Sequence, residues 1–341
     1  MDYCSLYSLG RSGLKISRII LGCMTFGSPH WQPWILDADA ALPLLKHAFA
    51  VGINTWDTAD VYSHGESERI IGKAIEHFKL PRHKLVIMTK CYFPVSEDGT
   101  QPPFNMFVRN NGEHVNSMGL SRKHIFDAVD GSTSRLKTYI DVLQIHRLDR
   151  ETDMTEIMRA LNDVVNSGKV RYIGASSMAA WEFQMLQNIA EKNGWHKFIS
   201  MQNYHNLIFR EEEREMIPYC KATGVGLMPW SPIARGALAR PFSDRGGSQR
   251  EQTDPLVNQR ARSSSADEQV IDRVEQLAKK HNVSMACIAT AWCIYHGECP
   301  IVGLNTSARM GEMVKGLAFK LPADDAAYLE EPYLPKAVTG Y

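Results

Sequence analysis

Four polar residues in this chain could together deliver a proton, and each lies at or shortly after the end of a short apolar run. The runs are residues 53–56, 85–89 and 142–145. The polar residues are Asp57, Tyr62, Lys90 and His146. If the runs are parallel strands, their carboxyl ends meet at one edge of one sheet, and the four side chains share one pocket.

The chemistry of such a set follows from the ordinary acidity of its members. A tyrosine phenol has a pKa of about 10 and is a weak acid near neutrality. An ammonium beside the Tyr62 oxygen stabilises the phenolate, so we expect Lys90 to lower that pKa. Asp57 would keep Lys90 charged, and His146 could orient a substrate oxygen from a second side. The set suits protonation of a carbonyl oxygen while a hydride attacks the carbonyl carbon.

Each residue alone also has a structural explanation. Tyr62 could be a packed aromatic residue, His146 a structural histidine, and Lys90 with Asp57 an ion pair at the mouth of a barrel. Four such coincidences at four equivalent positions are much rarer than any one of them. The combination therefore favours catalysis.

Short apolar runs alternate with amphipathic stretches along the chain, which is typical of repeated strand–helix units around a parallel sheet. A hairpin is predicted over residues 7–20, with Gly10 and Gly13 as turn residues. Eight strands are predicted at residues 18–21, 53–56, 85–89, 142–145, 170–174, 198–201, 225–229 and 300–302. Helices are predicted at residues 38–50, 67–77, 122–136, 154–166, 180–192, 211–222, 267–281, 284–295 and 308–317. Ser265 and Glu268 form a capping-box pattern, and that helix is expected to end at Asn282.

This order predicts an α/β fold, a (β/α)8 TIM barrel with an N-terminal β-hairpin, in one domain over residues 1–341. Two long polar segments, at residues 95–119 and 234–265, interrupt the alternation of predicted strands and helices. They follow the third and seventh predicted strands, so we expect them to be long loops at the C-terminal rim, where barrel active sites lie.

Composition excludes several classes of function. The 341-residue chain is 44% hydrophobic and 22% charged with a formal net charge of zero, so neither nucleic acid nor an anionic membrane is an expected partner. The longest apolar stretch, residues 285–295, is too short to cross a bilayer, and no secretory signal is recognisable. The seven cysteines form no C-x-x-C pair, which argues against a metal site or disulfide framework. A cytoplasmic protein with reduced thiols is expected.

The chain resembles the aldo-keto reductase superfamily in a series of motifs that occur in the family's order from near residue 7 to about residue 320. The motifs cover residues 21–27, 57–62, 65–68, 89–90, 139–146, 168–177 and 229–236. The sequence around residues 174–178 is most similar to the aryl-alcohol-dehydrogenase-like branch and, within it, to the versiconal hemiacetal acetate reductase group. Consistent with such a barrel, no G-x-G-x-x-G opens a helix.

The resemblance implies an NADP(H)-dependent reductase that interconverts an aldehyde or ketone and its alcohol, in fungal-type secondary metabolism or aryl-alcohol turnover. Tyr62 would be the proton donor, with Asp57, Lys90 and His146 completing a tetrad. Other implied cofactor contacts come from nearly every strand end. They are Gly22, Met24, Asp57, Ser176, Ser177, Gln202, Trp230, Ser231, Ile233, Arg235, Gly236, Gly303, Asn305 and Arg309.

Within that set, the resemblance gives individual roles. Ser176 and Gln202 would bind the nicotinamide carboxamide, and Trp230 would stack on the ring. Residues 231–236 would cover the pyrophosphate, and Arg309 at a helix start would favour a 2′-phosphate. The sequence departs from the family pattern at three of the positions. They are Ser177 and Met313, where asparagine is common, and Asn305, where a basic residue is common.

Three other interpretations remain open at this stage. A Schiff-base aldolase could use Lys90, but it would need a neutral amine, which Asp57 opposes. A metal-dependent hydrolase would need more ligands than His146 and Asp149 supply. A channel-associated regulatory subunit would bind nucleotide without catalysis.

The partner expected is a small carbonyl or alcohol, with an aromatic preference suggested by Trp31, Trp34 and Tyr92. The protein is expected to be a monomer or weak homo-oligomer.

Overall fold

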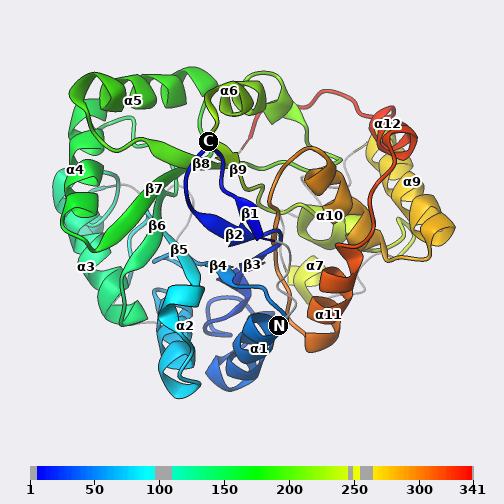
Figure 1. Cartoon of the computed structure of the whole chain (residues 1–341), viewed down its shortest axis with the longest axis horizontal. Coiled ribbons are helices and arrows are strands. Elements are labelled where there is room, and N and C mark those ends of the chain that lie inside the picture. The colour runs from blue at the N-terminus through cyan, green and yellow to red at the C-terminus, as the bar shows by residue number, and fades with distance from the viewer. Residues whose placement is uncertain (1–5, 97–109, 245–248, 254–263, 340–341) are drawn as a thin grey trace.

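Eight parallel strands curl into a barrel surrounded by helices in the computed structural model of the chain (Figure 1). The structure describes residues 6–96, 110–244, 249–253 and 264–339. The barrel strands are β3 (Ile20–Gly22), β4 (Thr55–Asp57), β5 (Val86–Cys91), β6 (Ile140–Ile145), β7 (Val170–Ser176), β8 (Phe198–Gln202), β9 (Gly226–Leu227) and β10 (Ile301–Val302). Their order is β10-β3-β4-β5-β6-β7-β8-β9.

The two end strands of this order meet and close the barrel. Trp230 forms a parallel bridge with Ile301, whose backbone N–H donates to the carbonyl of Pro229 at 3.0 Å. The predicted (β/α)8 fold is therefore confirmed. β9 and β10 are shorter than the predicted strands, and β3 begins two residues later than expected, because regular pairing covers only part of each apolar run.

Helices surround the strands of the barrel (Figure 1). These are α1 (Ala38–Ala50), α2 (Glu66–His77), α3 (Arg122–Leu136), α4 (Met154–Asn166), α5 (Ala180–Asn193), α6 (Met216–Thr223), α7 (Gln249–Thr253), α9 (Ser265–His281), α10 (Met285–Tyr295), α11 (Ser307–Gly316) and α12 (Ala323–Glu330). Several begin at a side-chain cap, as with Asp37, Ser121, Asp153 and Thr306, which each accept a backbone N–H.

Three of the sequence predictions for these helices need correction. The cap of α9 is Ser264, which accepts from the N–H of Asp267, so the predicted capping box at Ser265 is wrong by one residue. The predicted helix over 211–222 divides into a short 3-10 turn, Glu211–Glu213, and α6. α12 was not predicted. The predicted end of α9 at Asn282 is confirmed by its left-handed conformation, φ 53°.

Apolar side chains fill both surfaces of the barrel wall. The larger core lies between the sheet and helices α1–α5 and includes the fully buried Trp56 and Phe183. Inside the barrel, Met88, Val142 and Met228 pack with Leu9 and Ile16 of the N-terminal segment. That segment forms the predicted hairpin, β1 (Leu6–Ser8) with β2 (Lys15–Ser17), and closes the N-terminal end of the barrel. The opposite, C-terminal rim is thereby left as the open end.

The hairpin turn is held by a close backbone approach. Gly10 has φ 58°, and a Cβ there would lie 2.3 Å from the carbonyl oxygen of Gly224. The N–H of Arg11 donates to the same oxygen at 2.8 Å. Only glycine fits at position 10.

The structure describes part of each of the two long segments at the rim. The described part of the first contains a 3-10 turn at Gly112–His114, and the second contains a turn at Ala234–Ala239 followed by α7. The rest of these predicted loops lies outside the described residues. A third apolar cluster packs the second segment against α9 and α10, through Ala234, Ala237 and Leu238. The start of the second segment is therefore packed against α9 and α10.

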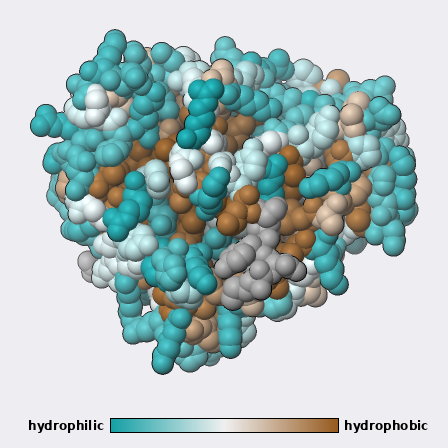
Figure 2. Space-filling view, viewed as in Figure 1, coloured by the Kyte–Doolittle hydropathy of each residue, from teal (hydrophilic) through white to brown (hydrophobic). Residues whose placement is uncertain are grey.

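Polar residues cover most of the periphery of the molecule on the face drawn in Figure 2, with hydrophobic residues visible around its centre. Within the described part of the chain, no helix is both long and apolar enough to cross a membrane.

Candidate active site

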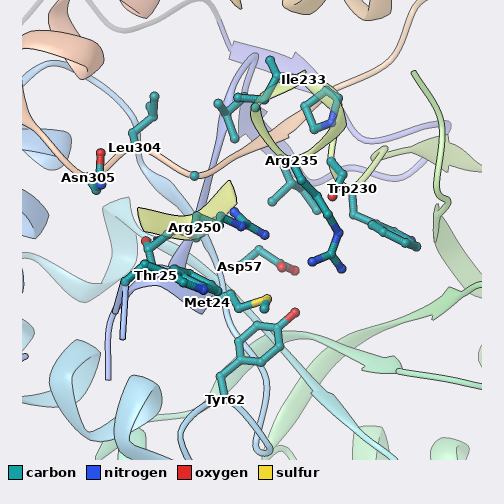
Figure 3. Close-up of a pocket in the computed structure, with 18 of the residues that line it drawn as sticks. Met24, Thr25, Asp57, Tyr62, Trp230, Ile233, Arg235, Arg250, Leu304 and Asn305 are labelled. Atoms are coloured by element: carbon teal, nitrogen blue, oxygen red, sulfur yellow. Dashed lines mark hydrogen bonds between the residues drawn. The ribbon is translucent and has the colours of Figure 1, made fainter. Parts of the chain in front are cut away.

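Three strand ends bring the four predicted catalytic side chains together at the open rim. Asp57 is the last residue of β4, and Lys90 is the next-to-last residue of β5. His146 directly follows β6, and Tyr62 lies in the turn between β4 and α2. Asp57, Tyr62 and His146 line a cavity of about 690 Å³, and Figure 3 shows the Asp57 carboxylate and the Tyr62 hydroxyl pointing toward one another.

The Lys90 ammonium lies at the centre of this group. It donates to Asp57 Oδ2 at 2.5 Å, to the carbonyl oxygen of Thr58 at 2.9 Å and to Tyr62 Oη at 3.3 Å. An ammonium has three N–H donors, so all of them have a partner. The Lys90 side chain is 1% exposed and that of Asp57 is 3% exposed, which makes this a buried ion pair.

Burial and charge act in opposite directions on the acidity of this group. Burial lowers the pKa of Lys90, but Asp57 and Tyr62 outweigh it, so the pKa is raised and the amine stays charged. Burial raises the pKa of Tyr62 above its usual range, and the lowering effect of Lys90 does not fully offset it. Lys90 therefore has the expected lowering effect on the Tyr62 pKa, but desolvation of the phenolate is the larger effect, so the net pKa is raised.

His146 is held as a neutral imidazole. Burial, and then the positive charges of Arg147 and Lys90, place its pKa well below the usual range. Its ring lies edge-on to that of Tyr62, with 5.9 Å between centroids. Its Nδ1 is buried and has no hydrogen-bond partner among the residues that the structure describes. A neutral ring beside the phenol can donate or accept a hydrogen bond without competing for the proton.

Two glutamines extend the polar group beyond the four predicted residues. Asp57 Oδ1 accepts from Gln144 Nε2 at 2.9 Å and from Gln202 Nε2 at 3.0 Å, and Gln202 Nε2 also reaches Gln144 Oε1 at 2.9 Å. Both oxygens of Asp57 are therefore engaged. Sequence reasoning gave no role to Gln144, although a fully buried glutamine within an apolar strand was a usable signal.

The residues implied for cofactor binding mostly line the same cavity. Those lining it are Gly22, Met24, Asp57, Ser176, Gln202, Trp230, Ser231, Ile233, Arg235, Gly236, Gly303, Asn305 and Arg309. Met313 also lines it. Figure 3 shows Trp230 and Arg235 to one side of Tyr62, and Leu304 with Asn305 to the other. The lining of one cavity thus includes both Tyr62 and residues at the start of α11.

Ser177 is the exception, because it is not among the residues that line the cavity. It is 3% exposed and accepts a hydrogen bond from Trp230 Nε1 at 3.2 Å. Its Oγ also lies 3.2 Å from Ser176 Oγ. The described contacts of Ser177 are thus with the indole and the neighbouring serine.

The aromatic residues expected near the rim fall into two groups. Trp31 and Trp34 line the cavity, and the ring of Trp31 lies 6.3 Å from that of Tyr62 between centroids. Tyr92 does not line it. Its neighbour Phe93 does, and packs edge-on against His146 with 5.2 Å between centroids. The side chain that follows β5 into the cavity is therefore Phe93.

Comparison with known proteins identifies the family. A model of the aldo/keto reductase family matches residues 18–333. The chain belongs to the aldo-keto reductase family. It is accordingly an oxidoreductase that acts on carbonyl and alcohol groups, in a family that uses nicotinamide cofactors. The described residues contain no group of three or more His, Cys, Asp or Glu that could hold a metal ion.

Related aldo-keto reductases are similar over nearly their whole length. The chain is 62% identical to the versiconal hemiacetal acetate reductase of Aspergillus parasiticus, covering 99% of this chain and 98% of that protein. It is 51% identical to a Schizosaccharomyces pombe protein named as a candidate aryl-alcohol dehydrogenase, covering 97% and 96%. An aldo-keto reductase of Metarhizium robertsii is 46% identical, covering 100% of this chain and 93% of that protein.

Proposed function

We propose that this aldo-keto reductase is an NADP(H)-dependent reductase of aldehydes or ketones in which Tyr62 supplies the proton. The observation that carries the proposal is the position of the Lys90 ammonium, 3.3 Å from the Tyr62 phenol oxygen and 2.5 Å from Asp57. A phenol held against a buried ammonium can release its proton to a substrate oxygen, because the resulting phenolate is stabilised in place.

The lining of the cavity offers polar and charged groups suited to a dinucleotide. The amide nitrogen of Gln202 donates to Asp57. Its amide oxygen would therefore accept a hydrogen bond from the nicotinamide carboxamide. Residues 234–236 form a tight turn with φ of 48°, 57° and 106°, in which the N–H groups of Ala234 and Gly236 donate to the carbonyls of Ser231 and Ile233. The guanidinium of Arg235 would add a positive charge at the pyrophosphate.

The adenosine end carries the preference for NADP(H). Thr306 caps α11, so the positive end of that helix faces the end of the cavity. Arg309 is exposed there and donates to Asn305 Oδ1 at 2.5 Å, which holds its guanidinium beside the helix start. A 2′-phosphate would suit both groups.

Within this proposal the residues have separate roles. When bound, the nicotinamide supplies a hydride to the carbonyl carbon. Tyr62 Oη gives its proton to the carbonyl oxygen, Lys90 stabilises the phenolate, and Asp57 keeps Lys90 charged. The neutral ring of His146 orients the substrate oxygen, and Trp230 offers a flat face to the cofactor ring. Trp31 and Phe93 give the substrate side an aromatic wall.

The family relatives suggest the substrate class. A versiconal hemiacetal acetate reductase and candidate aryl-alcohol dehydrogenases are among the most similar proteins. An aromatic aldehyde or ketone, in secondary metabolism or aryl-alcohol turnover, agrees with the aromatic wall of the cavity.

Substitution of Tyr62 by phenylalanine tests this function. NADPH oxidation in the presence of benzaldehyde should fall by roughly 100- to 10,000-fold, because the general acid is lost. NADPH binding, followed by protein fluorescence, should stay within threefold of wild type. Retained turnover in Tyr62→Phe would contradict the assignment of the acid.

Measurements on the wild type separate this function from two of its rivals. A nucleotide-binding regulatory subunit would bind NADPH without turnover in the wild type. A Schiff-base aldolase would be inactivated by borohydride with its carbonyl substrate, through reduction of an imine at Lys90. The raised pKa of Lys90 opposes imine formation, since the amine is protonated.

A further inference from the structure

The sequence motif Gly65-Glu66-Ser67-Glu68 has no part in the proposed chemistry, yet two of its side chains are fully buried. It begins α2 directly after the turn that carries Tyr62. Ser67 and Glu68 are both 0% exposed. Burial of a hydroxyl and a carboxylate is costly unless each is hydrogen-bonded, so their partners indicate what they do.

Ser67 holds the residue that receives one of the Lys90 hydrogen bonds. Thr58 Oγ1 donates to Ser67 Oγ at 2.8 Å, and Ser67 Oγ donates to the carbonyl of Cys23 at 2.8 Å. The carbonyl of Thr58 in turn accepts from Lys90 Nζ at 2.9 Å. Through this chain, Ser67 fixes the Thr58 carbonyl between the end of β3 and the end of β4.

Glu68 holds the strand from which Lys90 extends. Its Oε1 accepts from Thr89 Oγ1 at 2.5 Å, and Thr89 directly precedes Lys90 on β5. Its Oε2 accepts from Arg135 Nε of α3 at 2.6 Å. The carboxylate is thereby neutralised by Arg135 and joins α2 to β5.

Gly65 makes room for the arginine that neutralises Glu68. It has φ 85°, and a Cβ at this position would lie 2.4 Å from Arg135 Cδ. Both its backbone conformation and the approach of Arg135 therefore require glycine. The motif is explained as a unit: a glycine that admits Arg135, followed two and three residues later by the buried hydroxyl and carboxylate.

We propose that Ser67 and Glu68 are positioning residues that hold the Lys90 ammonium at hydrogen-bonding distance from the Tyr62 phenol. The inference rests on the proposed function in that Tyr62 is taken as the acid. Lysine has a long flexible side chain, so the position of its ammonium depends on how firmly its acceptors and its strand are fixed. A displacement of about 1 Å at such a site can cost roughly 100-fold in rate.

Isosteric substitutions of the two threonines test the proposal without removing a buried charge. Thr58→Val removes the bond to Ser67 but keeps the carbonyl that accepts from Lys90. Thr89→Val removes the bond to Glu68 but keeps its ion pair with Arg135. We expect each to lower kcat with benzaldehyde by roughly 10- to 100-fold, with NADPH affinity unchanged within threefold.

The pH dependence distinguishes positioning from a general loss of stability. Lys90 acts to lower the pKa of Tyr62, so an ammonium that has moved away should shift the alkaline limb of the kcat profile to higher pH. Ser67→Ala should behave like Thr58→Val, and the double variant should lose no more than either single variant. Ser132→Ala is the matched control, since Ser132 is equally buried and contacts Arg135 but neither threonine.

Crystal structures of Thr58→Val and Thr89→Val measure the position of the Lys90 ammonium without depending on catalytic activity. An increase of more than about 0.5 Å in the distance from Lys90 Nζ to Tyr62 Oη is expected. A distance unchanged from wild type in both variants would overturn the proposal, as would an unshifted pH profile. If the wild type reduces no aldehyde, the proposed function fails, and the crystal structures still decide whether these residues position Lys90.

Discussion

The indole ring of Trp230 stacks on the phenol ring of Tyr204, with 4.4 Å between centroids and 22° between planes. Phe209 stacks on Tyr204 in turn, with 4.6 Å between centroids. A second contact, from Trp230 Nε1 to Ser177 Oγ at 3.2 Å, fixes the ring's rotation. The ring that we propose as the nicotinamide platform is thus held by neighbours from the segments that follow β7 and β8.

Removal of the Tyr204 ring should weaken cofactor binding. In Tyr204→Leu the indole loses its stacking partner and samples other orientations, so we expect the Kd of NADPH to rise roughly 3- to 10-fold. Fluorescence titration measures the Kd. Tyr219→Leu is the control, because that ring packs on Phe183 away from the cavity. Equal effects of the two substitutions would argue against a role for the stack.

Arg147 should set the position of the pH optimum. Its charge lowers the pKa of Tyr62 and the pKa of His146, so Arg147→Met should raise both. In the proposed mechanism, reduction needs a protonated phenol and a neutral imidazole, so both limbs of the kcat/KM profile should move to higher pH by roughly a few tenths of a unit to one unit. Arg150→Met removes the same charge outside the cavity and should leave the profile in place. A profile that narrows or moves to lower pH would refute this expectation.

Arg309 should decide between the two nicotinamide cofactors. In Arg309→Ala the Kd of NADPH should rise roughly 10- to 100-fold, because a charge-assisted contact with the 2′-phosphate is lost. The Kd of NADH should not change. Lys315→Ala, in the last turn of the same helix, controls for the general loss of a positive charge. Parallel titrations with both cofactors give the answer, and an equal change for both would place the 2′-phosphate elsewhere.

A buried histidine outside the active site should make stability depend on pH. His205 lies between Glu298 at 2.9 Å and Glu213 at 3.0 Å, and the carboxylates overcome burial to raise its pKa to about 9. A folded pKa above the unfolded value of about 6.5 means that the stabilisation is complete below that pH. It is lost as the pH rises through about 9.

Comparison of His205→Gln with wild type measures this effect. The substitution should cost on the order of 3 kcal/mol of unfolding free energy at pH 6.0, as urea titration reports. The difference should shrink markedly at pH 9.5, where the wild-type imidazole is also neutral. His30→Gln, at an exposed position, should show neither effect. A cost that is independent of pH would mean that His205 contributes packing rather than charge.

The sequence determined the fold class and the four residues that we propose as the catalytic group. Eight apolar runs separated by helical patterns specify a parallel barrel. A strand that is buried on both faces appears in the sequence as a continuous apolar run, and strands of a parallel sheet are buried in this way. Asp57, Lys90 and His146 lie at strand ends, and strand ends of a parallel barrel share one rim. Their meeting at one cavity could therefore be predicted from the order of residues alone.

Tertiary structure decided the balance of forces within that group. Whether burial or Lys90 dominates the pKa of Tyr62 depends on how much water reaches the phenol, which no local pattern encodes. The partners of Asp57 and Glu68, which are Gln144, Gln202 and Arg135, come from distant parts of the chain. Ser177 occupies its family position in the sequence, but its side chain bonds to Trp230 beside the cavity, since its backbone is left-handed there, with φ 52°. Such contacts depend on the packing of strands and helices against each other, and only the folded chain defines it.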